Sequence, residues 1–293
     1  MPKSKSHELP AATAQIVTTR IWDNTAVRSS RVTLAAYLPK QTAYDGAGII
    51  VCPGGSYCWH DYKTEGTLVA EWLNTLGIAA FVLRYRVQGY IPFATHSRLI
   101  FGGHQHPQML EDIQRAIQLV RENAATYSVN PSRVGTMGFS AGGHLAMSAI
   151  EHAATDYLAP HSIHSAVSLR PDFAALLYPV VSMTHSCTHT RSRRALLGER
   201  GKNDESLRQA LSLEMHVPAD CPPVFLVNCA DDPIVHYHNS ELLDAALNDA
   251  AAPHRYIQYK TGGHGFGASD VKGTAECREW RREFVEWLNQ NLK

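Results

Sequence analysis

The sequence predicts an α/β fold in which a mostly parallel central sheet is covered by helices on both faces. Short, continuous apolar runs such as residues 48–52 and 78–83 are typical of strands that are buried on both sides. Amphipathic segments separate these runs, so that predicted strands and helices alternate along the chain. Because no linker, repeat or low-complexity segment divides the sequence, we expect a single domain over residues 1–293.

The first half of the chain is expected to supply two kinds of strand. Residues 16–22 and 31–38 are rich in β-forming residues and are separated by polar turn residues, which predicts an antiparallel pair. The apolar runs at 48–52 and 78–83 predict buried strands with a helix between them. Apolar positions then recur at helical spacing and predict an amphipathic helix from residue 107 to about residue 127.

The second half continues the same alternation of strands and helices. A short buried strand is expected at 134–137, followed by the start of a helix near Gly143. Large apolar residues at helical spacing predict a closing amphipathic helix over 280–288. Three further buried strands are expected, at 173–178, 224–229 and 256–259.

Two long stretches, 88–105 and 180–218, do not fit the alternation of strands and helices. Both follow strands whose carboxyl ends should lie on one edge of the sheet, where open α/β sheets bind ligands. We therefore interpret them as loop insertions that shape a site, although simple surface insertions explain them equally well. Residues 1–12 are expected to form a flexible N-terminus.

Composition excludes several classes of partner. The 27 basic residues balance the 27 acidic ones and form no basic block, which argues against a nucleic-acid partner. No apolar run approaches the ~20 residues that span a membrane, and no apolar segment follows the charged start as in a signal peptide. We therefore expect a cytoplasmic protein with a small-molecule or oligosaccharide partner, exported only if a leader has been removed. The six scattered cysteines indicate reduced thiols.

Residues 138–142, with the sequence Gly-Phe-Ser-Ala-Gly, are the strongest functional signal. A serine between two glycines at a strand-to-helix turn is the nucleophile elbow, in which Ser140 is lifted clear of the sheet. The glycines are required because side chains there would collide with the neighbouring strand and helix. The Ala141 N–H would then face any negative charge that forms beside Ser140. A chance pattern in a loop is the alternative.

A serine nucleophile needs a base and an orienting acid, which follow the serine in the order acid, then histidine, in this type of fold. Two carboxylates, Asp231 and Asp232, come directly after the predicted strand 224–229. We favour Asp232 as the acid because Pro233 rigidifies the next position, and we interpret Asp231 as a loop or capping residue. An N-cap for a helix starting near Val235 is the alternative role for Asp232.

The base is expected to be His264, which lies in a glycine-rich loop after the last predicted strand. Glycines on both sides of the histidine allow that loop to fold back toward the elbow. His254 precedes the last strand and would lie at the wrong end of the sheet. His236 and His238, just beyond the proposed acid, are weaker rivals.

An oxyanion hole needs further N–H donors besides that of Ala141. Gly54 and Gly55 follow the buried strand 48–52 and are the predicted donors, with the amide of Ser56 as a third possibility. An ordinary Pro-Gly turn is the alternative. Several histidines occur as close pairs, but none has a matching set of acidic or cysteine ligands, so we expect no metal and no cofactor.

These motifs together resemble the α/β-hydrolase superfamily, in the branch of carbohydrate acetyl esterases related to acetylxylan esterases and bifunctional acetyl/feruloyl esterases. The resemblance covers about residues 48–290 and implies an α/β-hydrolase fold. The matching segments are residues 52–57, 65–66, 83–86, 106–107, Asp112, 115–116, 138–145, 178–179, 231–235 and 262–267.

The resemblance implies Ser140 as nucleophile, His264 as base and Asp232 as orienting acid, with an oxyanion hole formed by Gly54, Gly55 and Ala141. Relatives often have a third glycine where this chain has Ser56, a departure that affects the local backbone and adds a hydroxyl near the substrate. Ser56, Tyr57 and His144 are therefore the expected substrate contacts.

The expected activity is hydrolysis of short acyl esters, most simply acetate on a sugar or on a xylan-derived oligosaccharide, through an acyl-enzyme on Ser140. A feruloyl esterase or an amide-cleaving hydrolase such as a peptidase or formamidase would use the same three residues. A binding protein that has kept only the hydrolase fold is the alternative of a different class. The sequence indicates no oligomeric state.

Overall fold

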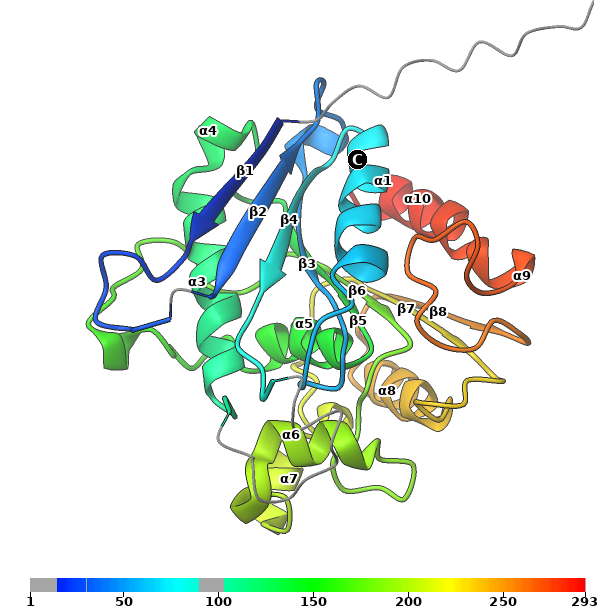
Figure 1. Cartoon of the computed structure of the whole chain (residues 1–293). Helices are drawn as coiled ribbons and strands as arrows, with labels where there is room; N and C mark the ends of the chain where they lie inside the picture. The colour runs from blue at the N-terminus through cyan, green and yellow to red at the C-terminus, as the bar shows by residue number, and fades with distance from the viewer. Residues whose placement is uncertain (1–14, 30, 90–102, 293) are drawn as a thin grey trace, which may run out of the picture.

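A computed structural model describes residues 15–29, 31–89 and 103–292 of the chain. The predicted N-terminal segment 1–12 and most of the predicted insertion 88–105 lie outside these residues. Among the described residues, eight strands form one sheet in the order β1-β2-β4-β3-β5-β6-β7-β8 (Figure 1). The strands are β1 (Gln15–Arg20), β2 (Thr33–Leu38), β3 (Gly48–Cys52), β4 (Ala79–Arg84), β5 (Val134–Phe139), β6 (Ala174–Leu177), β7 (Val224–Cys229) and β8 (His254–Tyr259).

The sheet is antiparallel at one edge and parallel elsewhere. Strand β2 pairs antiparallel with both β1 and β4, whereas the strands in the sheet order β4-β3-β5-β6-β7-β8 all pair parallel with one another. At its centre, β3 pairs with β4 on one side and β5 on the other, so that Cys52 lies opposite Gly138. The predicted antiparallel pair and the mostly parallel sheet are therefore confirmed, and the parallel strands share one edge with their carboxyl ends.

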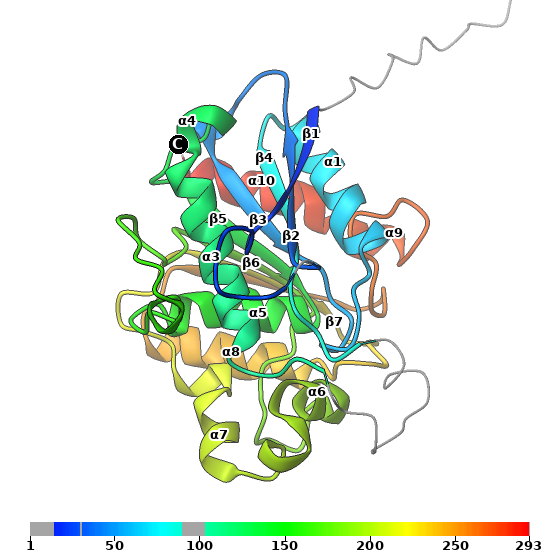
Figure 2. The ribbon, with the colours of Figure 1, turned by 60° about the vertical axis from the view of Figure 1, so that its left-hand side comes forward.

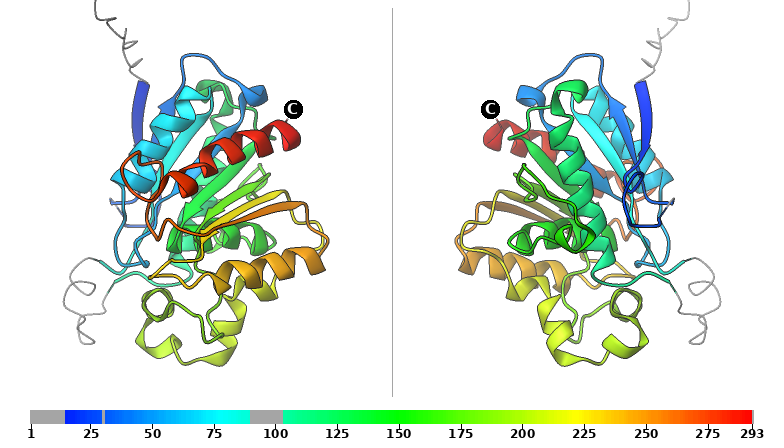
Figure 3. Two further views of the ribbon diagram at one scale, coloured as in Figure 1. Left: turned by 90° about the vertical axis from the view of Figure 1, so that its right-hand side faces the viewer. Right: turned by 90° about the vertical axis from the view of Figure 1, so that its left-hand side faces the viewer.

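Helices cover both faces of the sheet, as predicted (Figures 2 and 3). Helices α1 and α10 pack with Ile49 and Val51 on one face, whereas α3 and α5 pack with Ile50 and Cys52 on the other, where α8 covers β6 and β7. The longer helices are α1 (Leu68–Thr75), α3 (Gln108–Glu122), α5 (Ala141–Glu151), α6 (Thr190–Gly201), α8 (His238–Asp249) and α10 (Trp280–Asn291).

Short elements complete the described chain. Two element boundaries differ from the predictions: the helix expected over 107–127 is divided at Asn123 into α3 and α4, and the last strand begins at His254, two residues before the predicted start. The short elements are η1 (Tyr44–Gly46), η2 (Lys63–Thr67), α4 (Ala124–Tyr127), η4 (Ala159–His161), α7 (Glu205–Ala210), η5 (Leu213–Met215) and α9 (Ala275–Arg278).

The insertion 180–218 forms a separate helical layer beyond the carboxyl ends of the strands (Figures 1 and 2). It contains α6, α7 and η5, so the stretch interpreted as a loop insertion is largely helical. Ser192, Ala195 and Leu196 give α6 a buried side even though its sequence is polar, which explains why hydrophobic periodicity missed it. Within the described residues, no helix combines the length and apolar character needed to cross a membrane.

A buried ion cluster joins the antiparallel edge of the sheet to α3. The Asp112 side chain is fully buried and accepts hydrogen bonds from Trp22 Nε1 (2.7 Å) and from the Arg86 guanidinium (2.8 Å). Arg86 also pairs with Glu111 at 2.7 Å. Because a buried charge is costly unless it is paired, the Asp112 carboxylate is the central link of this cluster.

We predict that Asp112→Ala lowers the free energy of unfolding by about 3–5 kcal/mol, because it leaves Arg86 and the Trp22 N–H short of a buried partner. Urea denaturation followed by tryptophan fluorescence measures the change. Asp220→Ala is the matched control, since it removes an exposed carboxylate that pairs with Arg170 at the surface, and should have little effect. An equal decrease in the free energy of unfolding of the two variants would contradict the proposed contribution of the ion cluster to stability.

Candidate active site

Ser140 occupies the turn between β5 and α5 with a strained backbone, φ 55° and ψ −121°. The flanking glycines are sterically required. A Cβ on Gly138 would lie 2.1 Å from the Gly142 carbonyl oxygen, and one on Gly142 would lie 2.0 Å from the Cys52 carbonyl oxygen. The predicted elbow geometry is therefore present, and the positive φ of Ser140 costs on the order of 1–3 kcal/mol that the surrounding contacts offset.

Asp232 and His264 meet although 32 positions separate them in the chain. The carboxylate oxygen Oδ2 lies 2.6 Å from Nδ1 of the ring, and the Asp232 side chain is fully buried. Its other oxygen, Oδ1, accepts the N–H groups of Ile234 and Val235 at 2.8 and 3.0 Å. A carboxylate facing Nδ1 favours the tautomer with the proton on that nitrogen, which leaves Nε2 as an acceptor.

The rival carboxylate and the rival histidines lie elsewhere. Asp231 is exposed and accepts the N–H groups of Gly262 and Gly263, at 3.2 and 2.8 Å, so that it holds the loop of His264 rather than its ring. His254 pairs with Asp244 at 2.9 Å at the start of β8, the opposite end of the sheet. The N-cap alternative for Asp232 does not describe α8, which begins only at His238.

A cavity of about 390 Å³ brings Ser140 and His264 to one wall. Helix α6 closes part of it, which gives the predicted insertion 180–218 a place at the site. Within the described residues, no hydrogen bond joins the Ser140 hydroxyl to the His264 ring, although both residues line the cavity. The other lining residues are Gly55, Ser56, Trp59, Asp61, Glu65, His189, Thr190, Arg191, Pro233, Ile234 and Gly265.

The predicted oxyanion donors divide into two groups. The Gly54 N–H already donates to the Glu65 carboxylate at 2.7 Å, so the prediction that it faces an oxyanion is corrected. Gly54 serves the site through its small size, because a Cβ there would lie 2.8 Å from the Ser140 Cβ. The N–H groups of Gly55, Ser56 and Ala141 remain as candidate donors. Ser56 keeps a positive φ of 56°, a backbone shape that favours glycine.

Glu65 is the residue that sequence reasoning missed as part of the site. Its carboxylate is buried at the cavity, where it accepts the Gly54 N–H and, at 2.9 Å, the Tyr178 hydroxyl. Tyr178 in turn accepts the Gly267 N–H at 2.9 Å and packs on the His264 ring, with 4.5 Å between ring centroids. One buried chain therefore connects the Gly54 turn to the histidine loop.

The environment of Glu65 favours its neutral form. Burial raises the pKa of this carboxyl to about 7, and nearby His264 opposes the shift without cancelling it. Glu65 lies in a π-helical turn, η2, a local irregularity that is frequent at functional sites. The only signal in the sequence is the Glu65-Gly66 pair, which nothing in periodicity connects to the elbow.

Tyr57 and His144, two of the expected substrate contacts, lie in the core behind the cavity. Both are only 1% exposed, and the Tyr57 hydroxyl donates to His144 Nδ1 at 2.8 Å. His144 Nε2 donates to the Leu211 carbonyl at 2.8 Å, and burial lowers the pKa of this histidine to about 4. Both nitrogens of this neutral ring are hydrogen-bonded, so His144 connects α5 to the insertion. Of the three expected substrate contacts, only Ser56 lines the cavity.

Comparison with known proteins shows the family of this chain. The model of one protein family, BD-FAE, matches residues 34–247. The chain belongs to the BD-FAE family. An acetylxylan esterase of Xylanibacter ruminicola is 30% identical over 261 residues, which make up 88% of this chain and 48% of that protein. Endo-1,4-beta-xylanase B of Butyrivibrio fibrisolvens is 35% identical over 217 residues, or 74% of this chain and 32% of that protein.

This BD-FAE family member therefore spans about half or less of the length of these curated relatives. A solved structure covers it more evenly: an acetyl ester-xyloside bifunctional hydrolase from Caldicellulosiruptor lactoaceticus is 32% identical with a TM-score of 0.76, over 94% of this chain and 96% of that one. These comparisons confirm the predicted α/β-hydrolase fold and the relationship to carbohydrate esterases.

We predict that Glu65 makes native stability fall as pH rises from about 4.5 to about 7. In that interval the folded protein keeps a proton that the unfolded chain releases, so each rise in pH favours unfolding. The variant Glu65→Gln cannot titrate at this position and therefore lacks this contribution to the pH dependence of stability. The free energy of unfolding of the variant, relative to the native protein, should therefore rise by roughly 3 kcal/mol between pH 4.5 and pH 7.5. Urea titrations at several pH values measure it, and a pH-independent difference would contradict the shift.

Proposed function

We propose that this protein is a serine esterase that hydrolyses short acyl esters, with acetate on a sugar hydroxyl as its preferred substrate. The observation that carries the proposal is the 2.6 Å contact between Asp232 and His264 at the cavity that also exposes Ser140 on its elbow. The names of the relatives support an ester substrate, since they include an acetylxylan esterase and an acetyl ester-xyloside hydrolase.

In the first step Ser140 Oγ attacks the ester carbonyl carbon, and His264 Nε2 takes the hydroxyl proton. Asp232, which accepts the Nδ1 proton, orients the ring and stabilises the imidazolium that forms. Because the Ser140 hydroxyl has no hydrogen bond to the ring, attack requires a small rotation of one of the two side chains. A tightening of this kind on substrate binding is common in hydrolases.

The negative charge that develops on the carbonyl oxygen needs fixed donors. The Ala141 N–H at the start of α5 is one, and the amides of Gly55 and Ser56 are the others in this proposal. Each well-placed donor contributes roughly 3–4 kcal/mol to the stability of the transition state. The Glu65 contact with Gly54 holds the turn that carries two of these donors.

The intermediate collapses when His264 returns its proton to the alcohol oxygen, which breaks the ester bond and leaves the acyl group on Ser140. A water molecule then attacks the acyl carbon while the same ring accepts its proton. Release of the acid regenerates the free serine. A cavity of about 390 Å³, near the lower end for small-molecule sites, favours a short acyl group over a long one.

We predict that Ser140→Ala lowers kcat for p-nitrophenyl acetate by about 10³-fold or more, because no nucleophile remains, while the protein stays folded. Steady-state kinetics and circular dichroism measure the two effects. Ser132→Ala, at an exposed position in the turn before β5, is the matched control and should keep native activity. Retained turnover in Ser140→Ala would rule out the proposed nucleophile.

The same kinetics test the substrate class. On native protein, acetylated xylo-oligosaccharides should be hydrolysed with a higher kcat/KM than methyl ferulate or an acetyl anilide. Faster release of ferulate or of the amine would assign the site to one of the alternative hydrolases.

A second prediction separates the two neighbouring carboxylates. Asp232→Asn should lower kcat/KM by about 10³- to 10⁴-fold, because the amide favours the wrong tautomer of His264. Asp231→Asn should lower kcat/KM by less than about tenfold. Asp231 accepts hydrogen bonds only from loop N–H groups, and the amide oxygen of asparagine can replace one of the two acceptors. Hydrolysis of p-nitrophenyl acetate measures both, and the reverse order would make Asp231 the orienting acid.

A further inference from the structure

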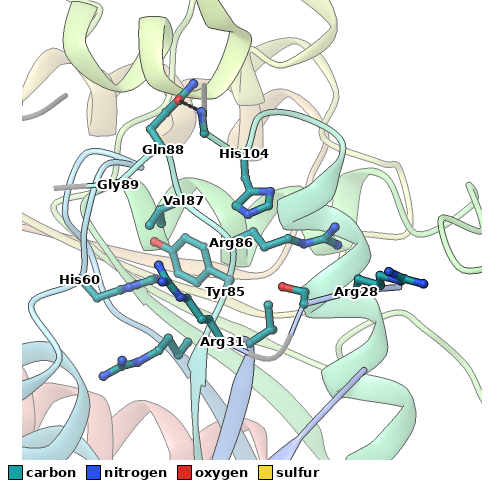
Figure 4. A pocket seen from close by; sticks show the side chains of 13 residues that line it. Arg28, Arg31, His60, Tyr85, Arg86, Val87, Gln88, Gly89 and His104 are labelled. Atoms are coloured by element: carbon teal, nitrogen blue, oxygen red, sulfur yellow. Dashed lines mark hydrogen bonds between the residues drawn. The ribbon is translucent and has the colours of Figure 1, made fainter. Parts of the chain in front are cut away.

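A second cavity, of about 540 Å³, lies on the other side of the loop that borders the catalytic cavity. It is formed by the turn between β1 and β2, the end of β4 and the residues that follow β4. Figure 4 shows the side chains of Arg31, His60, Arg86 and His104 around it. None of the roles assigned to the catalytic cavity uses this second one, which we call the basic pocket.

The basic pocket carries an excess of positive charge. Arg28, Arg31 and Arg84 line it, and its described lining contains no aspartate or glutamate. Arg86 also lines it but is neutralised by its buried carboxylate partners. Among the residues that the structure describes, the other three arginines form no salt bridge; Arg84 lies over the Tyr62 ring, with 4.9 Å to its centroid. The lining of the basic pocket therefore includes three exposed arginines, a composition that favours an anionic ligand.

His60 adds a different kind of polar group to the basic pocket. Its Nε2 atom is buried, and in the described part of the chain no group hydrogen-bonds to it. Burial and the nearby Arg84 lower the pKa of His60 to about 3, so the ring is neutral at physiological pH. A neutral imidazole beside guanidinium groups suits a ligand that presents hydroxyl groups as well as a negative charge.

The basic pocket and the catalytic cavity share one tight loop. Trp59 and Asp61 line the catalytic cavity, whereas His60 between them lines the basic pocket. A Cβ on Gly55 would lie 2.1 Å from the Trp59 carbonyl oxygen, which shows how closely this loop folds on itself. Trp59 is 36% exposed and lines the catalytic cavity, next in the chain to His60 of the basic pocket.

We propose that the basic pocket binds the carboxylate group of an acidic saccharide whose ester lies in the catalytic cavity. This inference rests on the proposed esterase function. The volume of the basic pocket exceeds what a simple inorganic anion needs. The lining of the pocket combines arginine side chains with the neutral imidazole of His60. A sugar chain that crosses Trp59 connects the two cavities, with the ester on one sugar and the carboxylate on another.

The test compares two substrates and two variants. The hydrolysis of acetylated xylo-oligosaccharides with and without a glucuronic acid branch is to be measured for the native protein and for the variants Arg31→Gln and Arg84→Gln. We expect the native KM to be about tenfold lower for the acidic substrate, and each variant to remove most of that difference, as for one charged hydrogen bond. The neutral substrate and p-nitrophenyl acetate should be unaffected. Arg282→Gln, on the exposed side of α10, is the matched control.

Salt provides an independent readout. Raising ionic strength from 50 to 500 mM should increase KM for the acidic substrate and leave KM for the neutral one unchanged, because only the former is held by charge. Equal KM values for the two native reactions would overturn the proposal. Inhibition by millimolar inorganic phosphate together with equal KM values would mean that the pocket takes free anions instead.

Failure of the esterase function itself would be recognised separately. Native protein that does not hydrolyse p-nitrophenyl acetate would contradict that function without bearing on the basic pocket. Calorimetric titration of Ser140→Ala with the acidic oligosaccharide then tests the pocket alone. Binding that Arg31→Gln weakens in this background supports the proposal, and affinity equal to that of the neutral oligosaccharide overturns it.

Discussion

The parallel pairing of β3 with β5 is the constraint on which the site depends. Their register places Cys52 opposite Gly138, so the turns that follow the two strands meet at the same edge of the sheet. The carbonyl of Cys52 then approaches Gly142 so closely that no side chain fits there. Gly54 lies against Ser140 for the same reason. The serine and the turn that carries the candidate oxyanion donors are therefore positioned by one pair of strands.

A second pair of parallel strands positions Asp232 and His264. β7 and β8 are parallel neighbours, and the turns after them carry Asp232 and His264. Glu65 joins the two halves, because its carboxylate contacts the turn after β3 and, through Tyr178, the loop after β8. Burial at this junction raises the pKa of the Glu65 carboxyl to about 7.

Much of this arrangement was predictable from the sequence, because strand periodicity and the elbow motif are local signals. Ser140, Asp232 and His264 follow from strand ends and from chain order, and the structure brings them to one place. Glu65 and the loss of the Gly54 donor were not predictable, since both depend on how two loops contact each other. Tyr57 and His144 lie near the elbow in sequence but behind it in space, a distinction that depends on side-chain direction.

The adjacent carboxylates Asp231 and Asp232 both position the loop after β8. Asp231 accepts hydrogen bonds from the backbone of this loop, and Asp232 contacts the ring of His264. These two anchoring carboxylates are neighbours in the chain, in the turn after β7. An insertion between the strand and this turn would displace both anchors at once. Length variation among proteins of this architecture should therefore concentrate in segments such as the α6–α7 layer, where new recognition surfaces can arise without disturbing the catalytic spacing.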